Sequence, residues 1–247
     1  SNYKLMINDQ TKLINGLNLL SLDSDPSLLK LLDQYFSFLS IENQKYNLTS
    51  IQNYDDYIDI HILDSLSIFF PINEIGIKFN NVVDIGTGPG FPGIPIKIFK
   101  NQIELYLVDS VNKKTQFLRQ LISLLNLNNI DVINSRIEAL GSQNKHREKY
   151  DLIVARAVAK LPTLIEISLP LLKNDGYCIF YKSNIDNDEY RSMLKTLDLF
   201  NAKLIDTYKI PFDFINKNRV LIIVQKMNDI DNKYPRSNNK PFRKPLF

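Results

Sequence analysis

A short apolar run that leads into a glycine-rich turn constrains this chain most. Residues 81–95 read NVVDIGTGPGFPGIP, with two valines before Asp84 and glycines at Gly86, Gly88, Gly90 and Gly93. Open α/β sheets place a nucleotide-like ligand where a buried strand ends in such a turn and continues into a helix. Glycine lacks a Cβ atom, so the backbone turns tightly and a ligand can approach it closely. The segment therefore predicts a strand–turn–helix unit with a ligand site at the turn.

The spacing of the glycines excludes two common phosphate-binding loops. A dinucleotide-binding turn follows G-x-G-x-x-G, which from Gly86 would require a glycine where Phe91 stands. A P-loop would continue with Gly-Lys-Ser or Gly-Lys-Thr, and no such run follows. The observed pattern is D-x-G-x-G-x-G, which begins at Asp84 and indicates a ligand without a pyrophosphate group.

A second acidic residue, Asp109, ends the next expected strand, 103–109. A carboxylate at the tip of the second strand can accept hydrogen bonds from both ribose hydroxyls. Together with the glycine turn it indicates adenosine without pyrophosphate, and S-adenosylmethionine is the common ligand of that kind. The alternative is that Asp109 only caps the helix expected from Asn112. We favour the cofactor, because both features end strands of one βαβ unit.

From residue 81 onward, strand and helix patterns alternate, which predicts a mainly parallel sheet covered on both faces. No helix separates the last two strands, so we expect them to pair antiparallel. The expected strands are 81–85, 103–109, 130–134, 150–155, 176–182, 203–209 and 219–226, and the expected helices between them are 92–100, 112–126, 161–173 and 186–199.

Upstream of the sheet the sequence is helical. A weak apolar stripe covers 8–20, Asp25-Pro26 is a strong helix start for a helix to about Asn43, and a further helix is expected from Tyr54 to Phe70, before Pro71. We therefore expect a helical cap over 1–75, a cofactor-binding domain over 76–230 and a basic tail over 231–247. The tail contains three prolines and no periodicity, which favours a mobile segment.

Charge is distributed unevenly along the 247 residues, although the net charge is only +3. Residues 1–80 hold 5 Lys/Arg and 10 Asp/Glu, residues 81–182 hold 13 and 9, and residues 231–247 hold 5 and 1. Basic excess in the cofactor domain and the tail hints at a polyanionic partner. No apolar run of 18 residues and no signal peptide is visible, so we expect a cytoplasmic protein without a membrane partner. Nothing demands an oligomer, and we expect a monomer.

The chain carries several longer motifs besides the glycine turn. They are NQKYNLTSI (43–51), HILDSL (61–66), VVDIGTGPGFPGIP (82–95), LVDSVNKKTQFL (107–118), SRIEAL (135–140), YDLIVARAVAKL (150–161) and KYPRSNNKPFRKPL (233–246). In these segments, over nearly its whole length, the chain resembles the small-subunit ribosomal RNA guanine-N7 methyltransferases, also called glucose-inhibited division protein B. It departs from that family at Glu42, where the family usually has Trp, and at Asn239, where the tail usually has glycine.

The resemblance implies an α/β fold of class I S-adenosylmethionine-dependent methyltransferases, which is Rossmann-like with a seven-stranded, mostly parallel sheet and an antiparallel last strand. It implies methylation of guanine N7 in the helix 18 loop of 16S ribosomal RNA in the bacterial small subunit. It places Gly86 and Phe91 at the cofactor, Ile137 and Glu138 beside its adenine, and Arg156 where the methionine end meets the target base. The candidate cofactor-binding residues are therefore Asp84, Gly86, Gly88, Phe91, Asp109, Ile137, Glu138 and Arg156.

The residues themselves fit methyl transfer to a ring nitrogen. Guanine N7 has a free lone pair and loses no proton before attack, so proximity and alignment are the main requirements. Methylation of pyrimidine C5 would require a cysteine nucleophile. The single cysteine, Cys178, lies inside an expected strand as a buried apolar residue, and it excludes internal disulfides and a multi-cysteine zinc site. An exocyclic amine often requires an Asn/Asp-Pro-Pro-Tyr/Phe motif, where this chain has ARAV (155–158). We expect no metal.

Basic side chains supply the remaining candidates. Arg156 and Lys160 follow the fourth strand and are candidate catalytic residues, because an arginine there can hold a carboxylate, a phosphate or guanine O6. The alternative is a surface arginine. We expect His61 to be a structural, hydrogen-bonded residue. The candidate RNA-binding residues are Lys113, Lys114, Arg136, Lys182, Lys233, Arg236, Lys240, Arg243 and Lys244, the last five in a tail that also carries Tyr234 and Phe242.

Three other functions compete with RNA methylation. A methyltransferase for a protein or a small metabolite would share the cofactor site, and salt-dependent RNA binding would discriminate between them. A ribosome-assembly module without turnover would be favoured by loss of cofactor binding. A nicotinamide-dependent oxidoreductase is least favoured, because Phe91 breaks the dinucleotide spacing.

Overall fold

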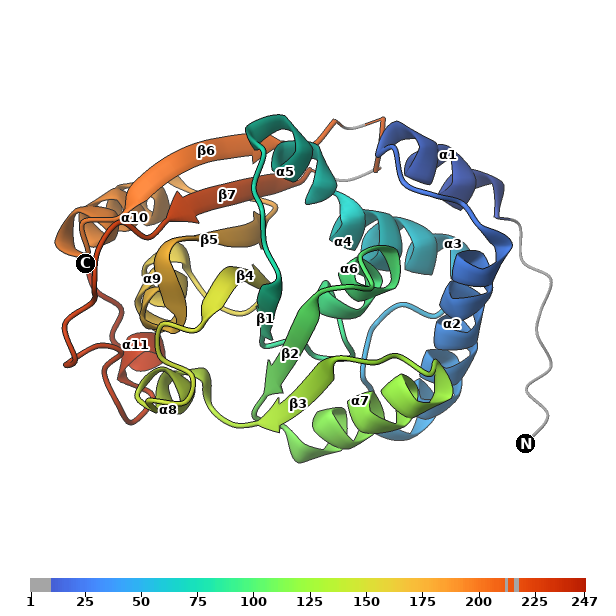
Figure 1. The fold of residues 1–247 in the computed structure, drawn as a ribbon, viewed down its shortest axis with the longest axis horizontal. Helices are drawn as coiled ribbons and strands as arrows, with labels where there is room; N and C mark the ends of the chain where they lie inside the picture. The colour runs from blue at the N-terminus through green and yellow to red at the C-terminus, as the bar shows by residue number, and fades with distance from the viewer. Residues whose placement is uncertain (1–9, 212, 216–217) are drawn as a thin grey trace.

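A seven-stranded sheet runs through the middle of the computed structural model, which describes residues 10–211, 213–215 and 218–247 (Figure 1). Residues 1–9 lie outside the described part, so the first residues of the expected helical stripe at 8–20 and of the cap at 1–75 are not covered. The strands are β1 (Asn81–Ile85), β2 (Glu104–Asp109), β3 (Ile130–Asn134), β4 (Tyr150–Arg156), β5 (Leu172–Lys182), β6 (Lys203–Lys209) and β7 (Val220–Gln225).

The strand order is β3-β2-β1-β4-β5-β7-β6. The first five strands of that order are parallel, and β7 lies antiparallel between β5 and β6. The expected parallel sheet with an antiparallel last strand is confirmed. Because the chain leaves β1 toward β2 and β3 but later adds β4 on the other side, the strand order reverses between β1 and β4. Ligands of open α/β sheets bind at such a switch point, outside the carboxyl ends of the strands.

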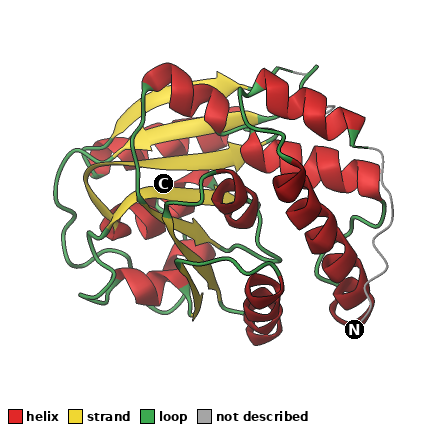
Figure 2. Ribbon diagram, turned by 45° about the vertical axis from the view of Figure 1, so that its right-hand side comes forward, coloured by secondary structure: helices red, strands yellow, loops and turns green. Residues whose placement is uncertain are grey.

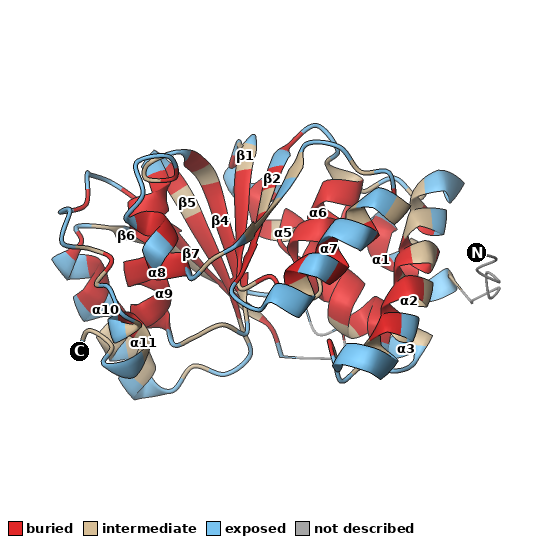
Figure 3. Ribbon diagram, turned by 90° about the horizontal axis from the view of Figure 1, so that it is seen from below, coloured by how far each residue is buried: buried red, intermediate tan, exposed pale blue. Residues whose placement is uncertain are grey.

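Both faces of the sheet are buried, which explains why its strands are nearly continuous apolar runs. Successive side chains of a strand point to opposite faces, so Val82 joins one hydrophobic cluster and Val83 the other. Figure 3 shows the buried strands between two groups of helices. The helices α8 (Ile137–Gly141), α9 (Leu161–Ser168) and α10 (Asn187–Leu199), the short η2 (Leu169–Leu171) and the tail with α11 (Lys240–Arg243) cover one face.

The other face carries the helical cap together with two crossover helices (Figure 2). The cap comprises α1 (Thr11–Leu19), α2 (Pro26–Tyr46), α3 (Tyr54–Asp56), η1 (Tyr57–Leu63), α4 (Asp64–Leu66) and α5 (Phe69–Ile75), and the crossover helices are α6 (Gly93–Phe99) and α7 (Asn112–Leu124). No helix in the described ranges is long and apolar enough to cross a membrane.

The start of α2 is as expected, since the Asp25 side chain accepts a hydrogen bond from the Ser27 amide at 2.7 Å and Pro26 opens the helix. The expected single helix from Tyr54 to Phe70 is wrong. The segment contains a π-helix, η1, and then breaks before α5, which continues through Pro71. A proline is tolerated there because α5 begins at Phe69, so Pro71 lies in its first turn, where backbone amides have no helical acceptor.

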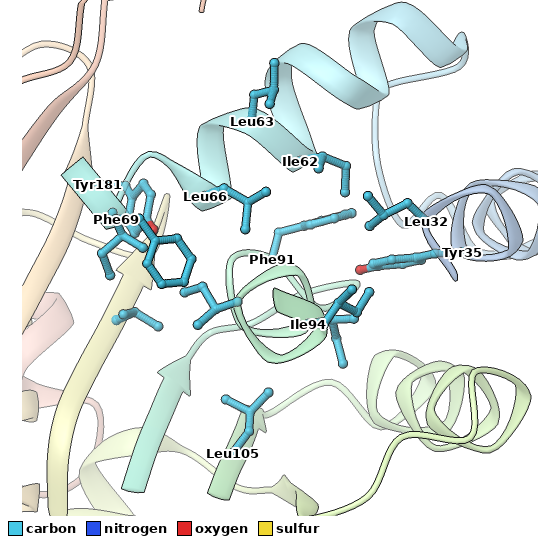
Figure 4. Close-up of a cluster of buried hydrophobic side chains, with 14 of the residues drawn as sticks. Leu32, Tyr35, Ile62, Leu63, Leu66, Phe69, Phe91, Ile94, Leu105 and Tyr181 are labelled. Atoms are coloured by element: carbon cyan, nitrogen blue, oxygen red, sulfur yellow. The ribbon is translucent and has the colours of Figure 1, made fainter. Parts of the chain in front are cut away.

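Aromatic packing joins the cap to the glycine turn. The ring of Phe91 stacks on His61 at 4.2 Å and on Tyr35 at 5.0 Å, and Figure 4 shows it among apolar residues of the cap and of α6. The Tyr35 hydroxyl donates to the Pro89 carbonyl at 2.5 Å. Cap and sheet thus share one hydrophobic cluster. The proposed boundary between them at residues 75 and 76 stays a prediction.

Candidate cofactor and substrate site

A cavity of about 300 Å³ opens at the switch point of the sheet. Its walls come from the residues that follow β1, β2, β3 and β4, as expected for a ligand site at the carboxyl ends of parallel strands. A further wall comes from the tail. The lining residues are Gly86, Asp109, Ser110, Val111, Lys114, Ser135, Arg136, Ile137, Glu138, Ala157, Val158, Asn239 and Phe242.

The turn after β1 has the tight backbone that its glycines predict. Gly86, Gly88 and Gly90 have φ angles of +66°, +59° and +109°. A Cβ atom on Gly86 would lie 2.6 Å from Cγ2 of Val158, a residue that also lines the cavity. Glycine is therefore required at Gly86 both by the backbone angle and by the close approach of the loop after β4.

The Asp109 side chain joins the glycine turn to the segment that follows β2. One carboxylate oxygen accepts a hydrogen bond from the Gly88 amide at 3.0 Å, and the other accepts from the Val111 amide at 2.9 Å. No amide within α7 is bonded to this side chain, and the helix has no side-chain cap. The alternative in which Asp109 only caps that helix is therefore wrong. The carboxylate retains lone pairs for a ligand, because each oxygen can accept more than one hydrogen bond.

Glu138 has the clearest feature of a ligand-binding side chain in the cavity. Its side chain is 4% exposed, and Oε1 is buried without a hydrogen-bond partner among the described residues. The nearest cation is the Arg136 guanidinium, at 3.7 Å from Oε1. Leaving a buried carboxylate oxygen unpaired costs free energy, so the cavity favours a ligand that donates a hydrogen bond there. An exocyclic amine of a purine is such a donor.

Asp84 lies behind the glycine turn and does not line the cavity. Its Oδ2 accepts hydrogen bonds from the Thr87 hydroxyl at 2.7 Å and from the Gly93 amide at 2.8 Å. Its Oδ1 is buried and has no hydrogen-bond partner in the described part of the chain. Burial raises the pKa of Asp84 to about 7, although the bonds from Thr87 and Gly93 and the charge of Arg156 act in the opposite direction. The side chain therefore links the turn to α6 rather than contacting a ligand from the cavity.

We expect the stability of the protein to fall as the pH rises from about 4 to about 7, between the unfolded and the folded pKa of Asp84. The folded state keeps a proton on Asp84 up to about pH 7, whereas the unfolded chain releases it near 3.8. The folded state thus binds more protons across this window, which lowers the free energy of unfolding by about 1.4 kcal/mol per pH unit below the folded pKa. The variant Asp84→Asn cannot ionise, so urea unfolding of both proteins at several pH values should show the variant gaining relative stability as pH rises. Parallel pH profiles would reject the assignment.

Arg156 is fixed at the end of β4 by a buried polar network. Its guanidinium donates to the Ile60 carbonyl at 2.8 Å, to Asp64 Oδ2 at 2.9 Å and to His61 Nδ1 at 3.0 Å. Asp64 also binds Arg219, at 2.5 and 2.7 Å. Two arginines share one carboxylate, so the cluster keeps a net positive charge at the edge of the sheet. The N–H groups of Arg156 that donate to no other described residue suit an anionic group of a ligand.

His61 has the structural role expected from the sequence. It is buried, and its Nδ1 must accept a hydrogen bond, because Arg156 can only donate. In the neutral ring the proton then lies on Nε2, which donates to the Thr49 hydroxyl at 2.8 Å. His61 comes from the π-helix η1, a local widening that is frequent near functional sites. The hydrogen bonds from Arg156 to His61 and from His61 to Thr49 connect residues 47–49 with the end of β4.

The structure brings four of the eight candidate cofactor residues together in the cavity, namely Gly86, Asp109, Ile137 and Glu138. The Phe91 side chain is instead 2% exposed within the cap interface, and Arg156 lies one residue before the lining residue Ala157. Lys160 is exposed at the N-cap position of α9. The roles of all these residues in binding or catalysis stay predictions, including those of the four that line the cavity.

The candidate RNA-binding residues fall into three groups. Lys182 donates to Glu189 at 2.7 Å, and Arg236 donates through two side-chain nitrogens to the fully buried Glu166. These two side chains have structural partners. Exposed side chains are found at Lys113, Arg136, Lys233, Lys240, Arg243 and Lys244. Lys114 is partly buried and lines the cavity, with Nζ at 3.8 Å from Asp109.

Several lining residues were not expected from the sequence. Ser110 and Val111 directly follow Asp109, and Ala157 and Val158 directly follow Arg156, so position after a strand was the available signal. Asn239 and Phe242 had no such signal, because only the folded tail brings them to the cavity. No group of three or more potential metal-ligating side chains occurs within the described ranges. Cys178 is fully buried in β5, and burial raises the pKa of its thiol.

The sheet order with an antiparallel β7, the non-phosphate glycine turn and the acid at the end of β2 define a class I S-adenosylmethionine-dependent methyltransferase. Solved structures share this fold. NSun6 from Pyrococcus horikoshii matches with a TM-score of 0.51 at 13% identity, covering 61% of this chain and 48% of that one. An rRNA methylase from Streptococcus thermophilus matches with a TM-score of 0.50 at 20% identity, covering 66% of this chain and 97% of that one.

Sequence comparison narrows the class to one family. The family model of GidB, rRNA small subunit methyltransferase G, matches residues 28–210. The ribosomal RNA small subunit methyltransferase G of Desulforamulus reducens is 40% identical over 214 residues, covering 87% of this chain and 88% of that protein. The protein of the same name from Lachnoclostridium phytofermentans is 36% identical over 240 residues, covering 97% and 98%. The chain belongs to the rRNA small subunit methyltransferase G family.

Proposed function

We propose that this enzyme transfers a methyl group from S-adenosylmethionine to N7 of a guanine in the helix 18 loop of 16S ribosomal RNA. The transfer is a direct displacement without a covalent enzyme intermediate. The names of the relatives support small-subunit ribosomal RNA as the substrate, and the resemblance of the motifs supports the guanine and its position. We further propose that the enzyme acts in the cytoplasm as a monomer.

The unpartnered Oε1 of Glu138 carries the placement of the cofactor. Glu138 and Asp109 line the same cavity, so one ligand can donate a purine amine to Glu138 and two ribose hydroxyls to Asp109. Adenosine meets both requirements. The methionine end then extends toward Gly86 and Ala157, where the positively charged network around Arg156 suits its carboxylate.

The residues around the cavity support alignment rather than acid–base chemistry. S-Adenosylmethionine would supply an electrophilic methyl group. Its transfer to guanine N7 would need no proton removal, because the sulfonium–carbon bond would break as the bond to N7 forms, with S-adenosylhomocysteine as the leaving group. Holding the two in line contributes up to about 7–11 kcal/mol of the barrier. Arg156 is positioned by its three hydrogen bonds, so its remaining N–H groups can orient the carboxylate or guanine O6. Cys178, being buried in the sheet, is excluded as a nucleophile.

Incubation with radiolabelled S-adenosylmethionine and 30S subunits that lack the modification tests the proposal. We expect label in 16S RNA, recovered after nucleoside digestion as 7-methylguanosine. Label in another nucleoside would reject N7, and label in a ribosomal protein would favour the rival methyltransferase activity. Cofactor binding without transfer to 30S subunits or to their assembly intermediates would favour the binding module.

Replacing Asp109 with alanine should weaken the binding of S-adenosylmethionine by roughly 1–3 kcal/mol, the cost of removing hydrogen bonds to a carboxylate. Isothermal titration calorimetry without RNA measures this directly. Asp131→Ala removes the same charge from an exposed position of β3 and is the matched control. Equal cofactor affinity in both variants would remove Asp109 from the ribose site.

We propose that exposed basic residues of the tail contact the phosphates of the RNA. Arg243 lines a second hollow of about 700 Å³ together with Arg136. Lys240 and Lys244 are exposed and adjoin the lining residues Asn239 and Arg243 in the sequence. Two guanidinium groups that share one hollow suit a phosphate of the RNA backbone. Arg236 is left out of this set, because Glu166 already binds it.

Replacing Lys240, Arg243 and Lys244 by alanine should flatten the salt dependence of RNA binding. Each lost phosphate contact lowers the slope of log K against log salt by about 0.7 for single-stranded RNA, hence by up to about 2 in total. The matched control replaces the exposed Lys145, Lys149 and Lys203, which precede β4 or begin β6 at the opposite edge of the sheet. Filter binding at several salt concentrations measures both slopes, and equal slopes would take the tail out of the interface.

A further inference from the structure

The C-terminal tail reaches the cofactor cavity. Figure 1 shows the tail and α11 beside α8 and α9, on the face of the sheet away from the helical cap. Asn239 and Phe242 line the same cavity as Asp109 and Glu138. The tail was expected to be a mobile, RNA-binding segment, whereas the structure packs it against the fold.

A buried ion pair anchors the middle of the tail. Glu166 of α9 is fully buried and accepts three hydrogen bonds from Arg236, one from the backbone amide at 2.9 Å and two from the guanidinium at 2.8 and 2.6 Å. The Thr163 hydroxyl, also on α9, donates to the Pro241 carbonyl at 2.8 Å. These contacts hold the tail at Arg236 and Pro241, so α9 fixes it on either side of Asn239 and directly before Phe242.

A second set of contacts holds the entry to the tail. Arg147 donates to the Tyr234 carbonyl at 2.8 Å and to the Ile230 carbonyl. The Tyr234 ring packs edge-on against Phe200, with centroids 4.8 Å apart. At Gly141, a Cβ atom would lie 2.9 Å from Cγ of Pro235, so α8 and the tail are in close contact. Such tight packing is possible only because residue 141 lacks a side chain.

The backbone conformation of the tail turns Phe242 toward the fold. Asn238 and Asn239 have φ angles of +58° and +60°, in the left-handed region that asparagine tolerates better than most residues. This accounts for asparagine at a position where the family usually has glycine. After this turn Phe242 is partly buried against the cluster that contains Ile137, while Lys240 and Arg243 are exposed.

We propose that Asn239 and Phe242 form one wall of the adenosine half of the cofactor site, so that docking of the tail is required for tight cofactor binding. The flat ring of Phe242 offers an apolar surface to a purine, while Glu138 on the same cavity offers an unpaired acceptor to the purine amine. This rests on the proposed placement of adenosine between Asp109 and Glu138.

Calorimetric titration of the full-length, RNA-free protein with S-adenosylmethionine and with S-adenosylhomocysteine tests the inference. Phe242→Ala should raise the Kd of both ligands about tenfold, the effect of losing about 1.4 kcal/mol of ring contact. Phe242→Leu, which keeps an apolar side chain if alanine disturbs folding, should raise it less. Phe247→Ala alters an exposed phenylalanine of the same tail and should leave the Kd unchanged.

A variant outside the cavity separates docking from direct contact. Gly141→Ala places a methyl group against Pro235 without touching the lining residues, so it should displace the tail and raise the Kd as well. A normal Kd in Phe242→Ala, with a raised Kd in Asp109→Ala, would overturn the inference while leaving the proposed cofactor placement intact. A normal Kd in all three variants would overturn the placement itself. RNA affinity that falls while cofactor affinity is unchanged would assign the tail to RNA alone.

Discussion

Replacing Asp64 with alanine is expected to lower the free energy of unfolding by about 3–5 kcal/mol, because it leaves two buried guanidinium groups without their shared carboxylate. Asp64 is fully buried, and its partners Arg156 and Arg219 are 11% and 5% exposed. Asp64 belongs to the cap and Arg156 ends β4, while Arg219 directly precedes β7. Losing Asp64 therefore removes the charge that joins these elements, and it frees the Arg156 side chain to leave its position.

Urea unfolding measures the stability change, and methyl transfer at a temperature where the variant is folded measures the effect on Arg156. The matched control is Asp188→Ala, which removes the partner of Arg191 from an ion pair whose side chains are 70% and 90% exposed. That control should lose less than about 1 kcal/mol, since exposed ion pairs contribute little. A loss equally small in Asp64→Ala would show that Arg156 and Arg219 find other partners or water.

Replacing Gly86 with valine is expected to cost about 2–4 kcal/mol and to abolish measurable cofactor binding. A β-branched residue at φ +66° is a strained outlier, and the new Cβ atom would stand 2.6 Å from Cγ2 of Val158. Val158 is itself a short, stiff side chain, so relief requires the loop after β4 to shift. Both residues line the cavity, and either adjustment changes its shape.

Gly76→Val isolates the backbone part of this effect. Gly76 ends α5 with φ +77°, and a Cβ atom there would meet nothing within 4 Å. It should cost about 1–2 kcal/mol and leave the cofactor Kd unchanged. Thermal unfolding and calorimetry on both variants distinguish strain from obstruction. Unchanged binding and full methyl transfer in Gly86→Val would refute a close approach between the glycine turn and the cofactor.

The strand pattern was predictable because both faces of the sheet are buried, which makes each strand an apolar run of limited length. The expected strands at 81–85, 130–134 and 203–209 match β1, β3 and β6. The helix from Tyr54 to Phe70 was predicted less well. Its apolar periodicity does not distinguish a π-helix from an α-helix, and a proline in the first turn of α5 leaves the same pattern as a proline after a helix end.

The candidate site was predictable where each residue immediately follows a strand of the parallel sheet. Gly86 directly follows β1 and Asp109 ends β2, and parallel strands bring their carboxyl ends to one edge. Glu138 was indicated only by the family resemblance. The partners of Arg156 were not predictable in this way. Ile60, His61 and Asp64 lie more than 90 residues earlier, and only the packing of the cap brings them to the end of β4.

The sequence by itself determined the sheet, the glycine turn and the acid at the end of β2, because these depend on side-chain size and polarity along a short stretch of chain. It also determined the charge of the tail, but not what that charge contacts. Tertiary structure alone decided that Arg236 binds the buried Glu166, that Phe242 enters the cavity, and that Glu138 keeps an unpaired oxygen there. These outcomes depend on contacts between residues far apart in the chain, which no local pattern of apolar and charged residues encodes.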